Sequence, residues 1–200
     1  AHAREPLPEP TGRFAVGTLS RALVDTTRGE SATEDPDDRR EIMLQFWYPA
    51  ESVDGLQAAP FLPSNEALVE AVFGSGGAIP MGIDLEKLHD EWDGVRTHAY
   101  PDAPLAQMPA TFPVLIFSHG FGGIRTQNRF QVEELASHGY VVVGVDHTYY
   151  ASAVEFPDGR IVKYGPLVNP NVPGLAMEKR EAALEEAVTV WAADVTAVAD

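Results

Sequence analysis

The sequence predicts an α/β fold built on a mostly parallel sheet with helices on both of its faces. Residues 114–117 and 140–146 are short apolar runs rich in β-branched side chains, which is typical of buried strands. A helical pattern at 126–138 lies between them and ends at Gly139. Strand, helix and strand joined by short connections make the two strands parallel. Because both strands are apolar on both faces, a helix layer is expected on each side of the sheet.

Two further strands are expected before this unit. Residues 14–24 alternate loosely between apolar and polar side chains, and residues 42–48 alternate with two fairly apolar faces before Pro49 ends the run. The polar segment 26–40 separates them, so we expect an antiparallel start to the sheet. Its clustered acids do not match an EF-hand, and a solvated loop is the expectation. These acids are Glu34, Asp35, Asp37 and Asp38.

Residues 50–112 are less regular than the flanking segments. Ser64 is the expected N-cap of a helix at 65–73, and Asp84 is the expected N-cap of a helix at 85–92. The whole segment fits either a cap over a pocket or an ordinary connection with surface helices. The sequence leaves both interpretations open.

Three more elements complete the predicted fold. A short strand is expected at 95–100, and a turn at 156–160 between two short apolar runs indicates a hairpin. Residues 177–198 show a strong helical pattern, with apolar side chains recurring every three, four or seven residues. We expect this apolar face to be buried, which needs no cofactor to explain it. The face comprises Met177, Leu184, Val188, Trp191, Val195 and Val198.

Composition excludes several classes of function. The chain has 200 residues, 44% of them hydrophobic, which suits one domain at residues 13–200 behind an extended tail at residues 1–12. A formal charge of −16 disfavours binding to nucleic acid or to an anionic membrane. No apolar run approaches the roughly 20 residues of a membrane helix, so no integral membrane segment is expected. Exposed carboxylates leave calcium binding open.

Cysteine is absent from the sequence, which removes disulfides, thiolate metal sites and cysteine nucleophiles. The first residues carry no apolar signal-peptide core and are rich in proline, as at the start of a processed protein. We therefore expect a secreted protein, with a cytoplasmic location as the alternative.

The most informative motif is the glycine-rich turn after the strand at 114–117. It reads Ser118-His119-Gly120-Phe121-Gly122-Gly123. Glycines allow positive φ and let backbone N–H groups turn toward an anion. In an open α/β sheet, ligands bind at the carboxyl ends of the strands, which is where this turn lies.

Three stretches in chain order carry a family pattern. They are Phe117-Ser-His-Gly-Phe-Gly-Gly-Ile-Arg125, Leu135-Ala-Ser-His-Gly-Tyr-Val-Val-Val143 and Val145-Asp-His147. Together they resemble the α/β-hydrolases of the platelet-activating factor acetylhydrolase and dienelactone hydrolase type, in particular bacterial lipase-like members. Residues 41–49 and 154–159 resemble the same family. The resemblance covers residues 11–200 and implies the α/β-hydrolase fold, of which this chain is the leading, amino-terminal half.

This resemblance implies a site at the glycine-rich turn. The backbone N–H of Phe121 is expected to donate to the oxyanion of an ester-hydrolysis intermediate. Gly120, Phe121 and Gly122 are expected to contact substrate. Tyr149 and Tyr150 are expected to line the acyl or alcohol pocket, although packing roles for both tyrosines are equally open. The substrate would be a small-molecule or lipid ester, and no organic cofactor is implied.

The polar residues around the turn are expected to support it. The base histidine follows the nucleophile in this family, so His119 is interpreted as bracing the turn and His147 as holding its own loop. Ser118 lacks the context of a nucleophile and is expected to be a buried hydroxyl bonded to backbone. Asp146 with both histidines could bind a metal, but no spacing indicates the three or four converging ligands that this requires, so no metal is predicted. Arg125 is expected to pair with an acid.

The family's nucleophile elbow, Gly-x-Ser-x-Gly, occurs nowhere in the sequence. The resemblance therefore implies that the nucleophilic serine, the acid and the histidine lie in a missing or separate carboxy-terminal part, such as a tight partner chain. The alternative is a non-catalytic remnant that acts as a binding module. A phosphorylated cofactor at the turn is a weaker alternative, since the dinucleotide and P-loop spacings are absent.

Overall fold

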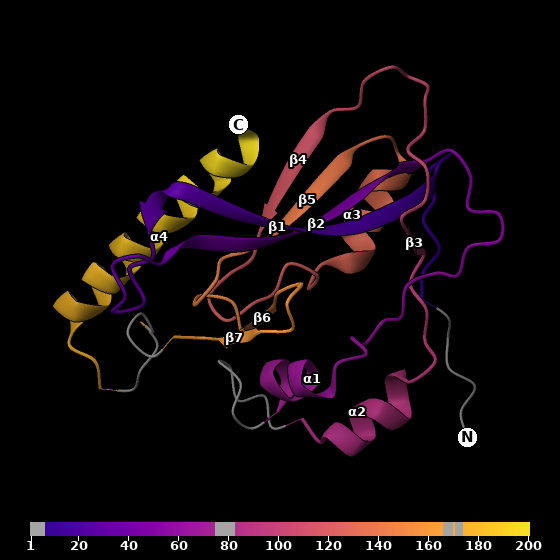
Figure 1. Ribbon diagram of the computed structural model, residues 1–200. Helices are drawn as coiled ribbons and strands as arrows, with labels where there is room; N and C mark the ends of the chain where they lie inside the picture. The colour runs from indigo at the N-terminus through magenta and orange to yellow at the C-terminus, as the bar shows by residue number, and fades with distance from the viewer. Residues whose placement is uncertain (1–6, 75–82, 166–169, 171–173) are drawn as a thin grey trace.

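A computed structural model describes residues 7–74, 83–165, 170 and 174–200. A five-stranded sheet in the order β3-β1-β2-β5-β4 forms its centre, and a separate two-stranded sheet pairs β6 with β7. Figure 1 shows α3 and α4 beside the large sheet, while α1 and α2 lie together below it. The α/β class is therefore confirmed.

The sheet begins with a long antiparallel hairpin, as predicted. Strand β1 (Ala15–Gly29) pairs with β2 (Arg39–Ala50), both longer than their sequence patterns indicate. The charged tip between them is exposed, in agreement with a solvated loop. The short strand β3 (Ala99–Pro101) adds in parallel to β1. It occupies only the end of the segment expected to be extended at 95–100.

The strand–helix–strand unit follows its prediction closely. Strands β4 (Val114–Ser118) and β5 (Val141–Asp146) are parallel, and α3 (Arg129–Ser137) connects them, starting three residues later than expected. Gly139 after the helix has φ +98°, a left-handed conformation that glycine adopts readily. Because β5 also pairs antiparallel with β2, the described sheet is mixed rather than mostly parallel.

Each face of the sheet has its own core. Helix α3 packs on one face, where Val132 and Ala136 meet Trp47 and Val142. On the other face Val198 of α4 (Met177–Ala199) packs against a second buried group. That group comprises Ile42, Leu44, Val143 and Val145. The expected helix on each side of the sheet is confirmed.

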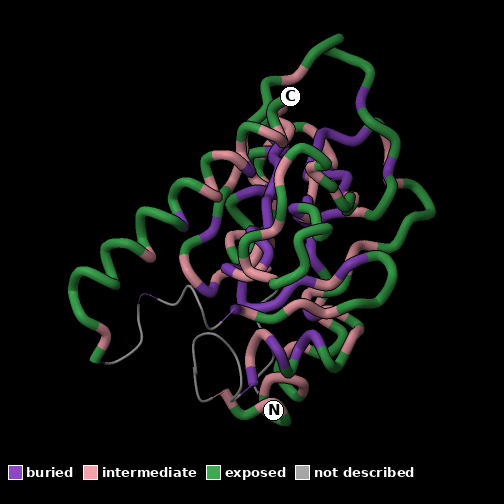
Figure 2. Tube along the Cα trace, turned by 60° about the vertical axis from the view of Figure 1, so that its left-hand side comes forward, coloured by how far each residue is buried: buried purple, intermediate pink, exposed green. Residues whose placement is uncertain are grey.

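The predicted buried face of α4 is wrong over the first half of the helix. Met177 and Val188 are 68% and 60% exposed, and the buried positions are Ala187 and Asp194. Figure 2 shows the beginning of α4 as an exposed rod that stands away from the sheet. The physical reason is that the sheet lies beside only the second half of the helix, near Trp191 and Val198.

The edge strand β4 is likewise poorly covered. Val114 is 61% exposed and Leu115 38%, although their strand reads as fully apolar. Among the described residues, the chain therefore exposes a sheet edge at β4 and apolar side chains on α4. Among them, no helix has the length and apolar character needed to cross a membrane.

The remaining elements agree with their predictions apart from one cap. Helix α1 (Glu66–Phe73) is capped by Asn65, whose side chain accepts from the Ala67 N–H, and not by Ser64. Asp84 caps α2 (Leu85–Trp92) as predicted. Strands β6 (Ala153–Glu155) and β7 (Ile161–Lys163) form the expected hairpin. Residues 1–6 of the predicted tail lie outside the described residues.

Candidate active site

The glycine-rich turn leaves β4 as a tightly bonded loop. The N–H of Gly123 donates to the carbonyl of Gly120 at 2.9 Å, and the N–H of Gly122 donates to the carbonyl of Tyr150 at 2.9 Å. Gly122 has φ +69°, which its lack of a side chain permits. Among the described residues, the N–H of Phe121 meets no protein acceptor. The Phe121 N–H is therefore available to donate to a bound group at the turn.

Strand periodicity decides which polar side chains meet beside this turn. Ser118 is the register partner of Val145 in the parallel pair, and side chains two residues apart share a face. Ser118, Val145 and His147 therefore point to the α4 side of the sheet. Asp146 points to the opposite side, toward Arg125.

Three side chains on the α4 side form a hydrogen-bonded series. Ser118 Oγ lies 2.7 Å from His147 Nε2, and His147 Nδ1 lies 2.9 Å from Asp194 Oδ2. The sequence-based expectation for Ser118 is corrected here: the residue is exposed, and its hydroxyl bonds an imidazole rather than the backbone. The reason is the parallel register, which aligns the end of β4 with the residues just beyond β5.

Two arginines hold the carboxylate of Asp194 in place. Arg40 donates to both of its oxygens, at 3.0 and 2.6 Å, and Arg28 donates at 2.8 Å. Asp194 and His147 are both inaccessible to solvent, and the side chain of Arg40 is 2% exposed. Burial alone would raise the pKa of Asp194, but hydrogen bonds from His147 and Arg40 outweigh it and hold the pKa well below its usual value. The group is a buried carboxylate.

His119 connects this series to the turn. Its Nε2 accepts from the backbone N–H of His147 at 3.2 Å, so its proton lies on Nδ1, which donates to the Gly120 carbonyl at 2.6 Å. Burial lowers the pKa of His119, which favours this neutral form. Trp191 of α4 stacks on the His147 ring, with centroids 5.1 Å apart, and packs on Phe121 at 4.8 Å.

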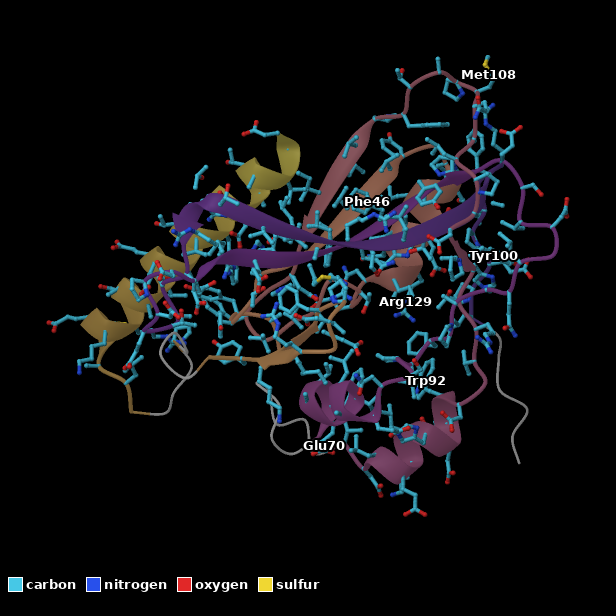
Figure 3. All side chains as sticks on the ribbon, viewed as in Figure 1. Phe46, Glu70, Trp92, Tyr100, Met108 and Arg129 are labelled. Carbon is cyan, nitrogen blue, oxygen red and sulfur yellow. The ribbon has the colours of Figure 1, made fainter. Side chains whose placement is uncertain are left out.

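The opposite side of the turn carries a local ion pair. The Arg125 guanidinium pairs with Asp146, whose other oxygen accepts from the Arg125 backbone N–H at 2.5 Å. Arg125 therefore pairs with an acid, as predicted. Beside the pair lies a cavity of about 540 Å³, bounded by α1, α3 and residues 122–127. Figure 3 shows Arg129 beneath α3, facing the layer of α1 and α2.

The two tyrosines after β5 are placed differently. Tyr150 is buried and lies beside Phe121, with ring centroids 6.3 Å apart. Tyr149 is partly exposed, has φ +70° and lies among charged groups that include Glu30 and Arg160. A bulky residue in the left-handed region is uncommon and marks a constrained loop. The structure thus brings Tyr150, rather than Tyr149, to the turn.

Asp194, Arg40 and Trp191 are the residues of this cluster that sequence reasoning missed or assigned only to packing. A signal existed for Asp194, because it lies three residues after Trp191 on the helix and so shares its face. No motif joins it to His147, which is distant in the chain. Within the described residues, no group of three histidines or acids has an arrangement that could hold a metal ion.

Comparison with known proteins gives a consistent family. A guinea pig (Cavia porcellus) platelet-activating factor acetylhydrolase is 29% identical over 113 residues, covering 56% of this chain. An Arthroderma benhamiae protein named probable 1-alkyl-2-acetylglycerophosphocholine esterase is 27% identical over 177 residues, covering 83%. The solved structure of a ferulic acid esterase from Streptomyces cinnamoneus matches 81% of this chain with a TM-score of 0.63 and 37% identity.

The chain spans less than half of each of these proteins. It covers 25% of the guinea pig enzyme, 43% of the Arthroderma protein and 42% of the ferulic acid esterase chain. The structural match confirms the α/β-hydrolase fold, and the three relatives carry names of ester hydrolases. The sequence profile of platelet-activating factor acetylhydrolase, isoform II, matches residues 1–156, and this chain belongs to that family.

Proposed function

We propose that this chain is the amino-terminal part of a serine carboxylic-ester hydrolase and that the Phe121 N–H stabilises the oxyanion. The observation that carries the proposal is the N–H of Phe121 at the end of β4, which has no acceptor among the described residues. A donor held by its surroundings and aimed at developing charge is the main catalytic device in acyl transfer. In such a reaction an activated serine attacks the ester carbonyl and forms an acyl-enzyme.

We propose further that the nucleophile, its acid and its histidine come from a carboxy-terminal part of the domain, in the same polypeptide or in a separate chain. Two observations support this. No Gly-x-Ser-x-Gly elbow occurs in the 200 residues, and the chain spans less than half of its relatives. The exposed edge strand β4 and the exposed first half of α4 offer apolar surface for that part to cover.

The proposed substrate class follows from the relatives' names. Acetylated glycerophosphocholine and ferulic acid esters differ in alcohol and acyl group but share a carboxylic ester. We propose a short-acyl ester of a lipid or a small molecule as substrate. His119 and His147 would support the oxyanion turn without touching the ester.

The test is fluorophosphonate labelling of the full-length protein, followed by intact mass and peptide mapping, together with turnover of p-nitrophenyl acetate. The proposal expects one adduct, on a serine outside this chain, and ester turnover that the adduct abolishes. The 200-residue chain alone, at 21.7 kDa, is the matched control and should gain no adduct.

Two results would contradict the proposal. An unlabelled, inactive full-length protein would favour a non-catalytic remnant that serves as a binding module. An adduct on Ser118 would assign the nucleophile to this chain and remove the need for a complementing part.

A further inference from the structure

His119 connects the series of Ser118, His147 and Asp194 to the peptide bond that we propose as the oxyanion donor. The carbonyl of Gly120 accepts from His119 Nδ1 at 2.6 Å and from the Gly123 N–H at 2.9 Å. That carbonyl and the Phe121 N–H belong to one planar peptide and point in opposite directions. Two donors on the carbonyl therefore fix the direction of the N–H, and they also polarise it.

The orientation of His119 depends in turn on the His147 backbone. His119 Nε2 accepts from the His147 N–H at 3.2 Å, which leaves Nδ1 protonated and directed at Gly120. The His147 ring is fixed on its own account. Its Nδ1–H donates to Asp194, Nε2 accepts from Ser118, and Trp191 stacks on its face.

The far end of the series lies on other elements of the fold. Asp194 comes from α4, and it is held by Arg28 near the end of β1 and by Arg40 at the start of β2. Arg40 also pairs with Glu30 at 2.8 Å and donates to the Thr148 carbonyl at 3.0 Å. The buried path thus runs from the hairpin of β1 and β2, through α4, to the turn after β4.

We propose that Asp194 and His147 are positioning residues that hold the Gly120–Phe121 peptide in the orientation an oxyanion requires. This inference rests on the proposed function, because it assigns a purpose to the oxyanion donor. Asp194 fixes the ring of His147 and so the position of that residue, and the backbone N–H of His147 keeps His119 directed at the Gly120 carbonyl. None of the three side chains would touch the substrate.

The hydrogen-bonded side chains of Ser118, His147 and Asp194 could suggest a complete catalytic triad. Two observations argue against it. Ser118 ends a regular strand, whereas a nucleophile elbow is a sharp turn between a strand and a helix. A general base must also return its proton to the leaving group, and His147 is wholly buried behind Trp191. The geometry therefore favours a positioning role.

The experiment measures kcat and KM for p-nitrophenyl acetate in the full-length protein with Asp194→Asn. We expect kcat to fall about 10- to 100-fold, less than the 10²–10³ that loss of a whole oxyanion donor costs, with KM changed less than about 3-fold. Asp158→Asn is the matched control, since Asp158 lies on the exposed β6–β7 turn. An unchanged kcat in Asp194→Asn, or an equal loss in Asp158→Asn, overturns the inference.

A second pair of variants serves if Asp194→Asn does not fold. His119→Leu removes the donor to the Gly120 carbonyl, whereas His119→Asn places an amide near the Nδ1 position. We expect kcat to fall at least about 10-fold in His119→Leu and to recover in His119→Asn, because only the amide can hold the peptide. Equal losses in both variants overturn the inference.

The Ser118→Ala variant distinguishes a positioning role of His147 and Asp194 from a catalytic triad that includes Ser118. The Ser118 hydroxyl is the exposed end of the series, so its removal should lower kcat less than about 10-fold. Removal of a nucleophile lowers kcat at least about 10³-fold. A loss of the larger size overturns the inference. Wild-type protein that neither turns over ester nor takes a phosphonate adduct contradicts the proposed function itself, which distinguishes the two failures.

Discussion

Two buried aspartates flank the glycine-rich turn, one on each face of the sheet, and they are held in different ways. Asp146 at the end of β5 pairs with Arg125, which lies two residues beyond the turn, so both partners belong to the strand–helix–strand unit of β4, α3 and β5. Asp194 pairs with Arg28 and Arg40 from the opposite end of the chain. One side of the turn is therefore stabilised within a single strand–helix–strand unit, and the other by elements from the two ends of the chain.

The largest expected effect is a difference in the free energy of unfolding between variants of these two aspartates. Asp194→Ala leaves Arg40, only 2% exposed, without its main partner, and should lower the free energy of unfolding by about 3–5 kcal/mol. Asp146→Ala should cost about 1–3 kcal/mol, because the Arg125 side chain is 15% exposed and can turn toward water. Urea unfolding of both variants measures the difference, and equal losses would break the comparison.

The Arg125 side of the turn could largely be predicted from sequence, and the Asp194 side could not. The strand, the turn and the helix follow from residues that are near one another in the chain, and Arg125 was expected to pair with an acid. That this acid is Asp146, 21 residues away, depends on the pairing of β4 with β5. The Ser118 contact with His147 needs the parallel register, and Asp194 needs the packing of α4 on the sheet. Helical periodicity alone was wrong for the first half of α4, where it counted Met177 and Val188 as buried, and it did not identify Asp194 as buried.

The same limit explains the smaller errors in the fold. Ser64 and Asn65 are both good caps, and only the backbone decides which one meets the first free N–H of α1. The mixed sheet arises because β5 lies next to β2, a pairing between segments about a hundred residues apart. Local patterns specify the elements, while their order in the sheet is a property of the whole chain.

The next largest expected effect on stability comes from steric crowding within the glycine-rich turn. A Cβ at Gly123 would lie 2.9 Å from the Cβ of His119 and closer still to the Gln127 side chain, whereas a Cβ at Gly120 would meet nothing within 4 Å. Gly123→Ala should therefore cost about 1–3 kcal/mol through forced displacement of the turn. Gly120→Ala should change stability by less than about 0.5 kcal/mol. Thermal unfolding of the two variants tests this, and similar losses would mean that the turn is crowded throughout.

His119, on the α4 side of the turn, should make the free energy of unfolding depend on pH. Burial lowers its pKa in the folded state, so between the unfolded value near 6.5 and the folded value the unfolded chain binds more protons. The free energy of unfolding then falls as pH drops from about 7, by at most about 1.4 kcal/mol per pH unit from this group. His119→Asn should remove that slope, while His138→Asn at an exposed site should keep it. Identical slopes in wild type and His119→Asn would contradict the assignment.

The smallest expected effect on stability comes from removing either of two serine hydroxyls, one on each side of the turn. Ser152 is buried and donates to the Gly122 carbonyl, so Ser152→Ala should cost about 1 kcal/mol because the carbonyl loses a partner that water cannot replace. Ser118 is exposed, and a water molecule can take the place of its hydroxyl beside His147. Ser118→Ala should therefore stay within about 0.5 kcal/mol of wild type in urea unfolding. A larger loss for Ser118 than for Ser152 would mean that the contact with His147 stabilises the fold itself, and the α4 side would then depend on its exposed end as well as on Asp194.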